Sequence, residues 1–160
     1  MKKAVFAGTF DPFTLGHLGL IRSALEAFDE VIVAVAAKSK SGVAADKRIE
    51  IAQKSVYELP SVSVLPFDGL LTDFLRENNC KFLVRGVRNT VDFEYEKNLH
   101  HLYAEMMPEI EIFYLFADSK SEFISSSNVR DILSFGGNAD KYVSKNALPC
   151  IKAEYSALKK

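Results

Sequence analysis

The chain has 160 residues, of which 48% are hydrophobic and 26% are charged, and its formal net charge is -1 at pH 7. This composition is that of an ordinary globular domain, and it excludes a strongly basic protein drawn to nucleic acid or to an anionic membrane. The longest apolar run, residues 31–37, is far too short to span a membrane. We therefore expect one domain over residues 1–160, with neither nucleic acid nor a membrane as a partner.

The first residues and the cysteines indicate a cytoplasmic protein. The apolar residues 4–7 are followed at once by Gly8 and then by Asp11 and Pro12, so this segment is too short for the core of a signal peptide. Cys80 and Cys150 form no metal-binding pattern, and a reducing compartment is the simplest expectation for them.

Short strand-like runs alternate with segments of helical period along the chain. Strands are expected at residues 4–7, 31–37, 62–65, 81–84 and 110–116. Helices are expected at residues 18–28, from about 46 to 59, at 70–75 and at 95–106, because apolar residues recur there at spacings of three and four. Ser126 or Ser127 is expected to cap a further helix, and Pro149 to begin the last one.

This alternation of strands and helices predicts an α/β fold with a doubly wound, parallel, five-stranded sheet. Parallel neighbours need crossover connections, and these are right-handed and place helices on both faces of the sheet. Ligands of such sheets bind beyond the carboxyl ends of the strands. The residues that follow each predicted strand are therefore the candidates for a functional site.

The first strand is followed by a turn and a helix with the features of an anion site. Gly8 permits a sharp turn, Thr9 and Phe10 offer backbone amides, and Gly16 permits close approach of a ligand. His17 lies on the first turn of the helix, where the helix dipole favours an anion. A lone histidine here is more often a capping residue, and only the surrounding pattern favours a role in binding phosphate.

The loops after the second and third strands carry weaker signals. Lys38 and Lys40 could grip phosphates, although a lysine pair is more often part of a solvated loop. Leu71 follows the third strand and could form the wall of a pocket for an extended acceptor. Packing of the next helix explains Leu71 equally well.

Two arginines beside a glycine follow the fourth strand. Arg85 and Arg88 flank Gly86 and Val87, and arginine forks match phosphate oxygens while a glycine permits close approach. Because Arg85 directly follows apolar residues, phosphate recognition is favoured over a surface charge. Glu96 lies further along, in the next predicted helix, where it could be a surface carboxylate or could orient a ligand or an arginine.

A serine-rich segment after the fifth strand opens another helix and offers a second cradle for an anion. A plain helix cap with spare serines is the alternative. The segment consists of Ser121, Glu122, Phe123, Ile124, Ser125, Ser126 and Ser127.

Several common catalytic patterns are missing from the sequence. It contains no P-loop, no G-x-G-x-x-G after the first strand, no cysteine nucleophile motif and no zinc spacing. What remains is a phosphate site without an evident nucleophile. Such a site suits direct in-line transfer between two bound, phosphate-bearing substrates.

Four separated blocks of the sequence resemble the bacterial phosphopantetheine adenylyltransferases, a family of the nucleotidyltransferase superfamily with an H/T-x-G-H motif. They are residues 8–17, which end in Thr-Leu-Gly-His, and residues 85–88, 92–96 and 123–127. The resemblance implies a Rossmann-like nucleotidyltransferase fold. It implies transfer of the adenylyl group of ATP to 4'-phosphopantetheine, giving dephospho-coenzyme A and pyrophosphate in coenzyme A biosynthesis. It also implies magnesium (Mg2+) and a homohexamer.

The same resemblance assigns roles to individual residues, and none of them is named as a ligand of the metal. His17 and Lys40 would be catalytic, although the lysine loop is shortened and Lys38 remains an alternative. The acceptor would contact Thr9, Lys40, Leu71 and Arg85. ATP would contact Thr9, Phe10, His17, Gly86, Val87, Arg88, Glu96 and the segment from Ser121 to Ser127, where Ser121 replaces a tryptophan common in the family.

Two kinds of alternative function remain at this point. One is a related nucleotidyltransferase that acts on nicotinate mononucleotide or glycerol phosphate. The other is a non-catalytic nucleotide sensor, which would bind its ligand without releasing pyrophosphate. A pure binder has no need of groups that stabilise a transition state, so the intact motif ending at His17 and the paired arginines favour an enzyme.

Overall fold

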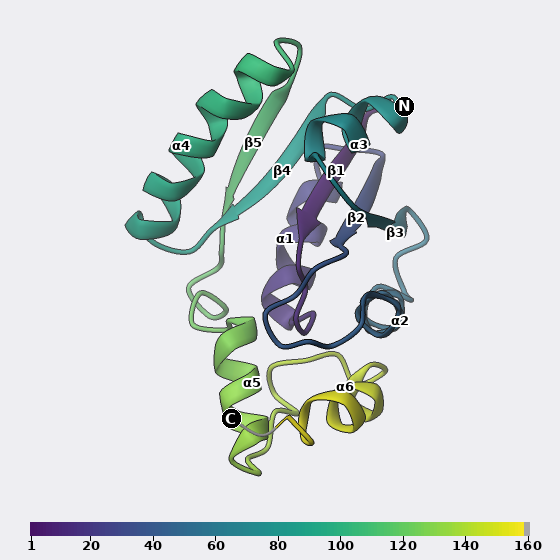
Figure 1. The fold of residues 1–160 in the computed structure, drawn as a ribbon, viewed down its shortest axis with the longest axis vertical. Helices are drawn as coiled ribbons and strands as arrows, with labels where there is room; N and C mark the ends of the chain where they lie inside the picture. The colour runs from purple at the N-terminus through teal and green to yellow at the C-terminus, as the bar shows by residue number, and fades with distance from the viewer. Residues whose placement is uncertain (159–160) are drawn as a thin grey trace.

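The computed structural model describes residues 1–158 and contains one five-stranded sheet. All strands are parallel and lie in the order β3-β2-β1-β4-β5, which confirms the predicted doubly wound fold. Figure 1 shows the arrangement. The strands are β1 (Lys3–Gly8), β2 (Glu30–Ala36), β3 (Val62–Phe67), β4 (Phe82–Val87) and β5 (Glu111–Phe116). The helices are α1 (Leu15–Leu25), α2 (Ala45–Ser55), α3 (Leu71–Glu77), α4 (Thr90–Met106), α5 (Ser126–Ser134) and α6 (Leu148–Tyr155).

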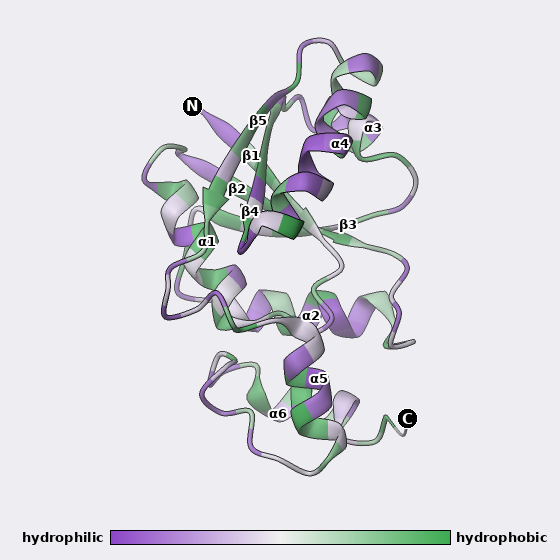
Figure 2. Cartoon of the chain, turned by 90° about the vertical axis from the view of Figure 1, so that its left-hand side faces the viewer, coloured by the Kyte–Doolittle hydropathy of each residue, from purple (hydrophilic) through white to green (hydrophobic). Residues whose placement is uncertain are grey.

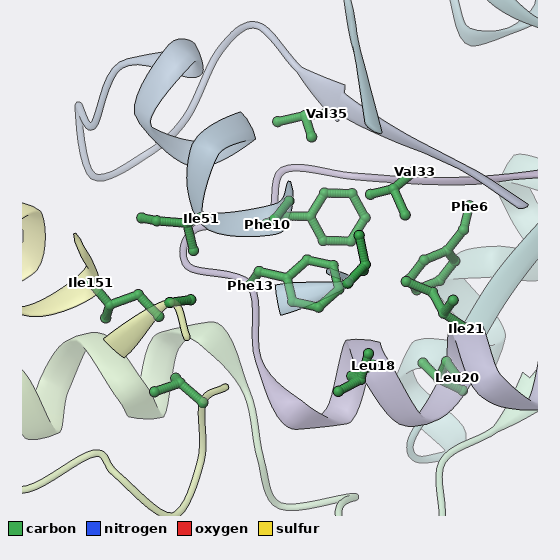
Figure 3. Close-up of a cluster of buried hydrophobic side chains, with 14 of the residues drawn as sticks. Phe6, Phe10, Phe13, Leu18, Leu20, Ile21, Val33, Val35, Ile51 and Ile151 are labelled. Carbon is green, nitrogen blue, oxygen red and sulfur yellow. The ribbon is translucent and has the colours of Figure 1, made fainter. Parts of the chain in front are cut away.

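The two faces of the sheet bury separate apolar clusters, as expected for strands with a side-chain period of two. On one face, residues such as Phe6 and Val33 pack with α1, α2, α5 and α6, and Figure 3 shows part of this cluster. On the other face, Val5 and Ile32 pack with α3. Figure 2 shows the apolar strands between helices that carry more polar residues. The central strands are thereby fixed in place, and so are the loops that follow them.

The carboxyl ends of the strands point toward α5 and α6, which lie together beyond that edge of the sheet (Figure 1). The N-terminus of α5 therefore faces the turn after β1. Across residues 1–158, no helix combines the length and the apolar character needed to cross a membrane.

Three details of the sequence-based prediction were wrong. β4 continues to Val87, so Arg85 and Gly86 lie within the strand, because pairing with β5 extends over Tyr114, Leu115 and Phe116. The N-cap of α5 is Ser125, whose hydroxyl accepts a hydrogen bond from Asn128 N–H at 3.0 Å, and neither Ser126 nor Ser127 caps the helix. The last helix begins at Leu148, one residue before the expected position.

Candidate active site

A cavity of about 360 Å³ opens at the carboxyl ends of β1, β4 and β5. Twelve of the predicted site residues line it. They are Thr9, Phe10, His17, Arg85, Gly86, Arg88, Glu96, Ser121, Ile124, Ser125, Ser126 and Ser127. Their segments are far apart in the sequence, and the parallel sheet brings them to one edge.

Five predicted residues do not line this cavity. Leu71 and Val87 are buried in the apolar core, so packing accounts for both side chains. Lys40, Glu122 and Phe123 are exposed on loops, and the ring of Phe123 lies edge-on against Tyr142 with centroids 6.3 Å apart.

His17 is held by a capping box at the start of α1. Thr14 is the N-cap, and its backbone N–H donates to His17 Nδ1 at 3.0 Å, while its hydroxyl accepts from the backbone N–H of His17. Because Nδ1 accepts a hydrogen bond, the proton of the neutral ring belongs on Nε2. The histidine that the sequence presented as either a cap or a phosphate ligand is thus a capping residue whose second nitrogen remains a donor.

Three phenylalanine rings surround the imidazole. Phe10 meets His17 edge-on with ring centroids 5.0 Å apart, and Phe13 and Phe6 lie at 5.3 and 6.3 Å. Burial among these rings, followed by the positive charge of Arg88, lowers the pKa of His17 to about 4. His17 is therefore a neutral Nε2–H donor at physiological pH.

This pKa predicts a pH-dependent contribution of His17 to stability. Between the native pKa of about 4 and the unfolded value of 6.5, the unfolded chain binds more protons, so the native state loses stability as the pH falls through this range. The free energy of unfolding can be measured with urea from pH 4 to 7. We expect its increase with pH to be smaller in His17→Gln than in the unaltered protein, by up to about 1 kcal/mol per pH unit. Equal slopes in the two proteins would contradict this prediction.

Arg85 and Glu96 form a closer ion pair than the other pair at the cavity, Arg88 and Asp92, with nearest atoms 2.6 Å against 3.0 Å apart. Arg85 Nε and Nη2 donate to the two carboxylate oxygens at 2.8 and 2.6 Å, and Nη1 donates to the carbonyl of Ala7 at 3.1 Å. Burial opposes the charge of Arg85, but the hydrogen bonds and charge of Glu96 outweigh burial and raise its pKa. Of the alternatives for Glu96, the structure supports orientation of an arginine.

Asp92 is a cavity residue that the sequence-based site omitted. Its carboxylate accepts hydrogen bonds from the backbone N–H and Nε of Arg88 at 3.2 and 3.0 Å. The spacing of four residues between an arginine and an aspartate is a signal that could have identified this pair. The pair orients the side chain of Arg88 on the wall of the cavity.

The serines at the start of α5 have different partners. Ser125 caps the helix, Ser126 donates to the carbonyl of Pro12 at 2.8 Å, and Ser127 accepts from Arg130 at 3.3 Å. Their hydroxyl groups fix the helix end. The first backbone amides of an α-helix lack partners within the helix, so this end of the cavity attracts an anion.

Residue 86 must be a glycine because a neighbouring side chain occupies the space of a Cβ atom. A Cβ atom at this position would lie 2.3 Å from Cδ1 of Leu20, a buried residue that also lines the cavity. We expect Gly86→Ala to destabilise the protein by about 1–3 kcal/mol and to raise the KM of the ligand that the cavity binds, because Leu20 must move into the cavity. Leu20→Ala in the same chain is expected to restore the KM, as steady-state kinetics would show. A KM unchanged by Gly86→Ala would contradict the prediction.

The doubly wound parallel sheet, with a cavity lined by His17, two arginines and the N-terminus of α5 at its carboxyl edge, fits the nucleotidyltransferase class. The chain matches the cytidylyltransferase-like family model over residues 5–132. It is 43% identical over 155 residues to the phosphopantetheine adenylyltransferase of Tolumonas auensis, covering 96% of the chain and 94% of that protein. It is 41% identical over 143 residues to the phosphopantetheine adenylyltransferase of Nautilia profundicola, covering 88% and 93%. The chain belongs to the phosphopantetheine adenylyltransferase family.

A more distant solved structure supports the fold. It is a proposed nicotinate-nucleotide adenylyltransferase from Vibrio parahaemolyticus, which is 19% identical, covers 99% of both chains and has a TM-score of 0.74. At this identity the likeness concerns the fold alone. The two relatives of over 40% identity are named for phosphopantetheine.

Proposed function

We propose that this protein transfers the adenylyl group of ATP to 4'-phosphopantetheine, giving dephospho-coenzyme A and pyrophosphate. The observation that carries the proposal is the neutral Nε2–H donor of His17, held at the cavity with Arg88 and the N-terminus of α5. Relatives of over 40% identity along most of the chain are named for this activity.

The mechanism follows from where charge develops. An oxygen of the acceptor phosphate attacks the α-phosphorus of ATP, and the bond to pyrophosphate breaks on the opposite side, without a covalent enzyme intermediate. Negative charge develops on the equatorial oxygens, where the Nε2–H of His17 and the amides of α5 donate. His17 stays neutral, so it stabilises this charge by donating a hydrogen bond without giving up its proton.

The acceptor is assigned to Arg85 on β4, the turn after β1 and the loop after β2. Arg85 uses three of its five N–H groups on Glu96 and Ala7, which leaves two for the acceptor phosphate. Thr9 is exposed and also lines the cavity, and Lys40 would reach in from the exposed loop after β2. Leu71 is buried in the apolar core at the start of α3, so its contact with the pantetheine arm would require that arm to reach the core.

Magnesium is proposed to arrive with ATP. Within residues 1–158, no group of three or more histidine, cysteine, aspartate or glutamate side chains could hold a metal ion. The cavity carboxylates Asp92 and Glu96 are both paired with arginines. Phosphate oxygens and water suit Mg2+, which would neutralise part of the phosphate charge when bound.

A homohexamer in the cytoplasm is part of the proposal. α4 buries only Glu96, and it exposes apolar side chains such as Val91 (78%), Tyr95 (62%) and Leu102 (51%), which is unusual for a helix that faces only solvent. Such a face favours association with further copies. The free thiols of Cys80 and Cys150 suit a reducing compartment.

The decisive experiment supplies the protein with ATP, Mg2+ and one acceptor at a time. We expect pyrophosphate and dephospho-coenzyme A from 4'-phosphopantetheine, with a far lower kcat/KM for nicotinate mononucleotide and glycerol phosphate. A preference for either of those acceptors would overturn the choice of substrate. Nucleotide binding without pyrophosphate from any acceptor would identify a sensor instead.

A further inference from the structure

The loop that carries Lys40 is anchored at both ends by a buried arginine. Arg48, on α2, has no solvent exposure. Its Nη2 donates to the carbonyl of Ala37 at 2.8 Å, its Nε donates to the carbonyl of Val43 at 3.0 Å, and its Nη1 donates to the carbonyl of Thr9 at 2.6 Å. A single guanidinium thus joins the two ends of the lysine loop to the first turn of the active site.

The middle of the same loop is held by Asp11. The backbone N–H and the hydroxyl of Ser41, the residue after Lys40, donate to the Asp11 carboxylate at 3.2 and 2.5 Å. Ser41 Oγ also accepts from the N–H of Val43 at 3.2 Å. Because Asp11 is itself buried in the turn after β1, the position of Ser41 is tied to that turn.

Asp11 is oriented in turn by the C-terminal helix. The hydroxyl of Tyr155, at the end of α6, donates to Asp11 Oδ1 at 2.7 Å, although 144 residues separate the two. This is the oxygen that also accepts from the Ser41 hydroxyl. Tyr155 is 1% exposed. Burial first, and then the carboxylate of Asp11, raise its pKa, so the hydroxyl keeps its proton and remains a donor. Arg130 lies 3.8 Å from the other oxygen and completes the surroundings of Asp11.

We propose that Asp11 and Tyr155 are positioning residues for Lys40, so that α6 controls the rate of adenylyl transfer through the loop after β2. The inference rests on the proposed function, in which Lys40 reaches the acceptor phosphate from the loop after β2. Lysine is a point charge on a flexible stem, so its effect depends on where the backbone places that stem. A displacement of about 1 Å at a reacting centre can cost up to about a hundredfold in rate.

The first test reads the loop without any assay of activity. Two variants each remove one hydroxyl from the network, Tyr155→Phe and Ser41→Ala. We expect both to speed hydrogen exchange at the amides of residues 38–43, measured by mass spectrometry. The matched control is Ser55→Ala, which removes a buried hydroxyl that donates to the carbonyl of Ile51 at 2.8 Å, away from this loop. Its exchange in residues 38–43 is expected to equal that of the unaltered protein.

The second test is kinetic. Tyr155→Phe and Ser41→Ala are expected to lower kcat about tenfold and to change the KM of either substrate less than twofold. Ser55→Ala is expected to keep the original kcat. In a Lys40→Ala background, Tyr155→Phe should lower kcat no further, because the tyrosine acts through the lysine.

Three results would overturn the inference. They are unchanged exchange in residues 38–43, a loss of kcat no larger than that of Ser55→Ala, and a full additional loss in the Lys40→Ala background. Absence of turnover in the unaltered protein would instead refute the proposed function. In that case the exchange experiment alone would decide whether Asp11 and Tyr155 hold the loop.

Discussion

Replacing His17 by alanine is expected to lower kcat by about 10²–10³-fold while the KM of each substrate changes less than about threefold. The reason is that the hydrogen bond from His17 is stronger in the transition state than in the ground state. A neutral Nε2–H donor gains most when charge accumulates on the phosphate oxygens, so its loss raises the barrier without weakening ground-state binding by the same amount. Steady-state kinetics with saturating ATP and varied acceptor, and the converse, would measure both constants.

The conservative variant His17→Gln is the control for this prediction. Its side-chain amide offers an N–H donor at a similar reach, so it should retain more turnover than His17→Ala. Circular dichroism and the unfolding midpoint would show that both variants fold, since His17 also belongs to the capping box with Thr14. An alanine variant with unchanged kcat, or with its loss confined to KM, would remove His17 from this role.

The fold could be predicted because its physical cause is visible in the sequence. A strand buried on both faces leaves a continuous apolar run, and residues 31–37 show one. The helix at α4 was also predicted by its apolar spacing, yet Tyr95 and Leu102 of that stripe are exposed in this chain. Periodicity therefore identified the helix but not the surface against which its apolar stripe packs.

The segments that form the cavity could be predicted from the topology alone, because every strand of a parallel sheet ends at the same edge. The partners of individual side chains could not. Nothing in the spacing of Lys40 indicates that its side chain stays outside the cavity, and nothing links Asp11 to Tyr155. Three adjacent serines each suit a helix cap by residue type, and only the structure shows that Ser125 caps the helix while Ser126 binds the carbonyl of Pro12.

Replacing Glu96 by glutamine is expected to lower the free energy of unfolding by about 3 kcal/mol. The change keeps the shape of the side chain but leaves the charge of Arg85 without a partner, at a site where both side chains are largely buried. Urea denaturation would measure the loss. The control is Glu94→Gln, an exposed residue of the same helix, which should change stability by less than about 0.5 kcal/mol.

A double replacement separates the structural role of this pair from its part in binding. Arg85→Met together with Glu96→Leu removes both charges, so it should be more stable than Glu96→Gln alone, because no buried charge is left unpaired. The same double variant lacks the two spare N–H groups of Arg85, and its KM for 4'-phosphopantetheine should rise at least about tenfold. If Glu96→Gln were as stable as the unaltered protein, the prediction would be contradicted. That result would mean that solvent screens the charge of Arg85, and that Glu96 is not needed to orient it.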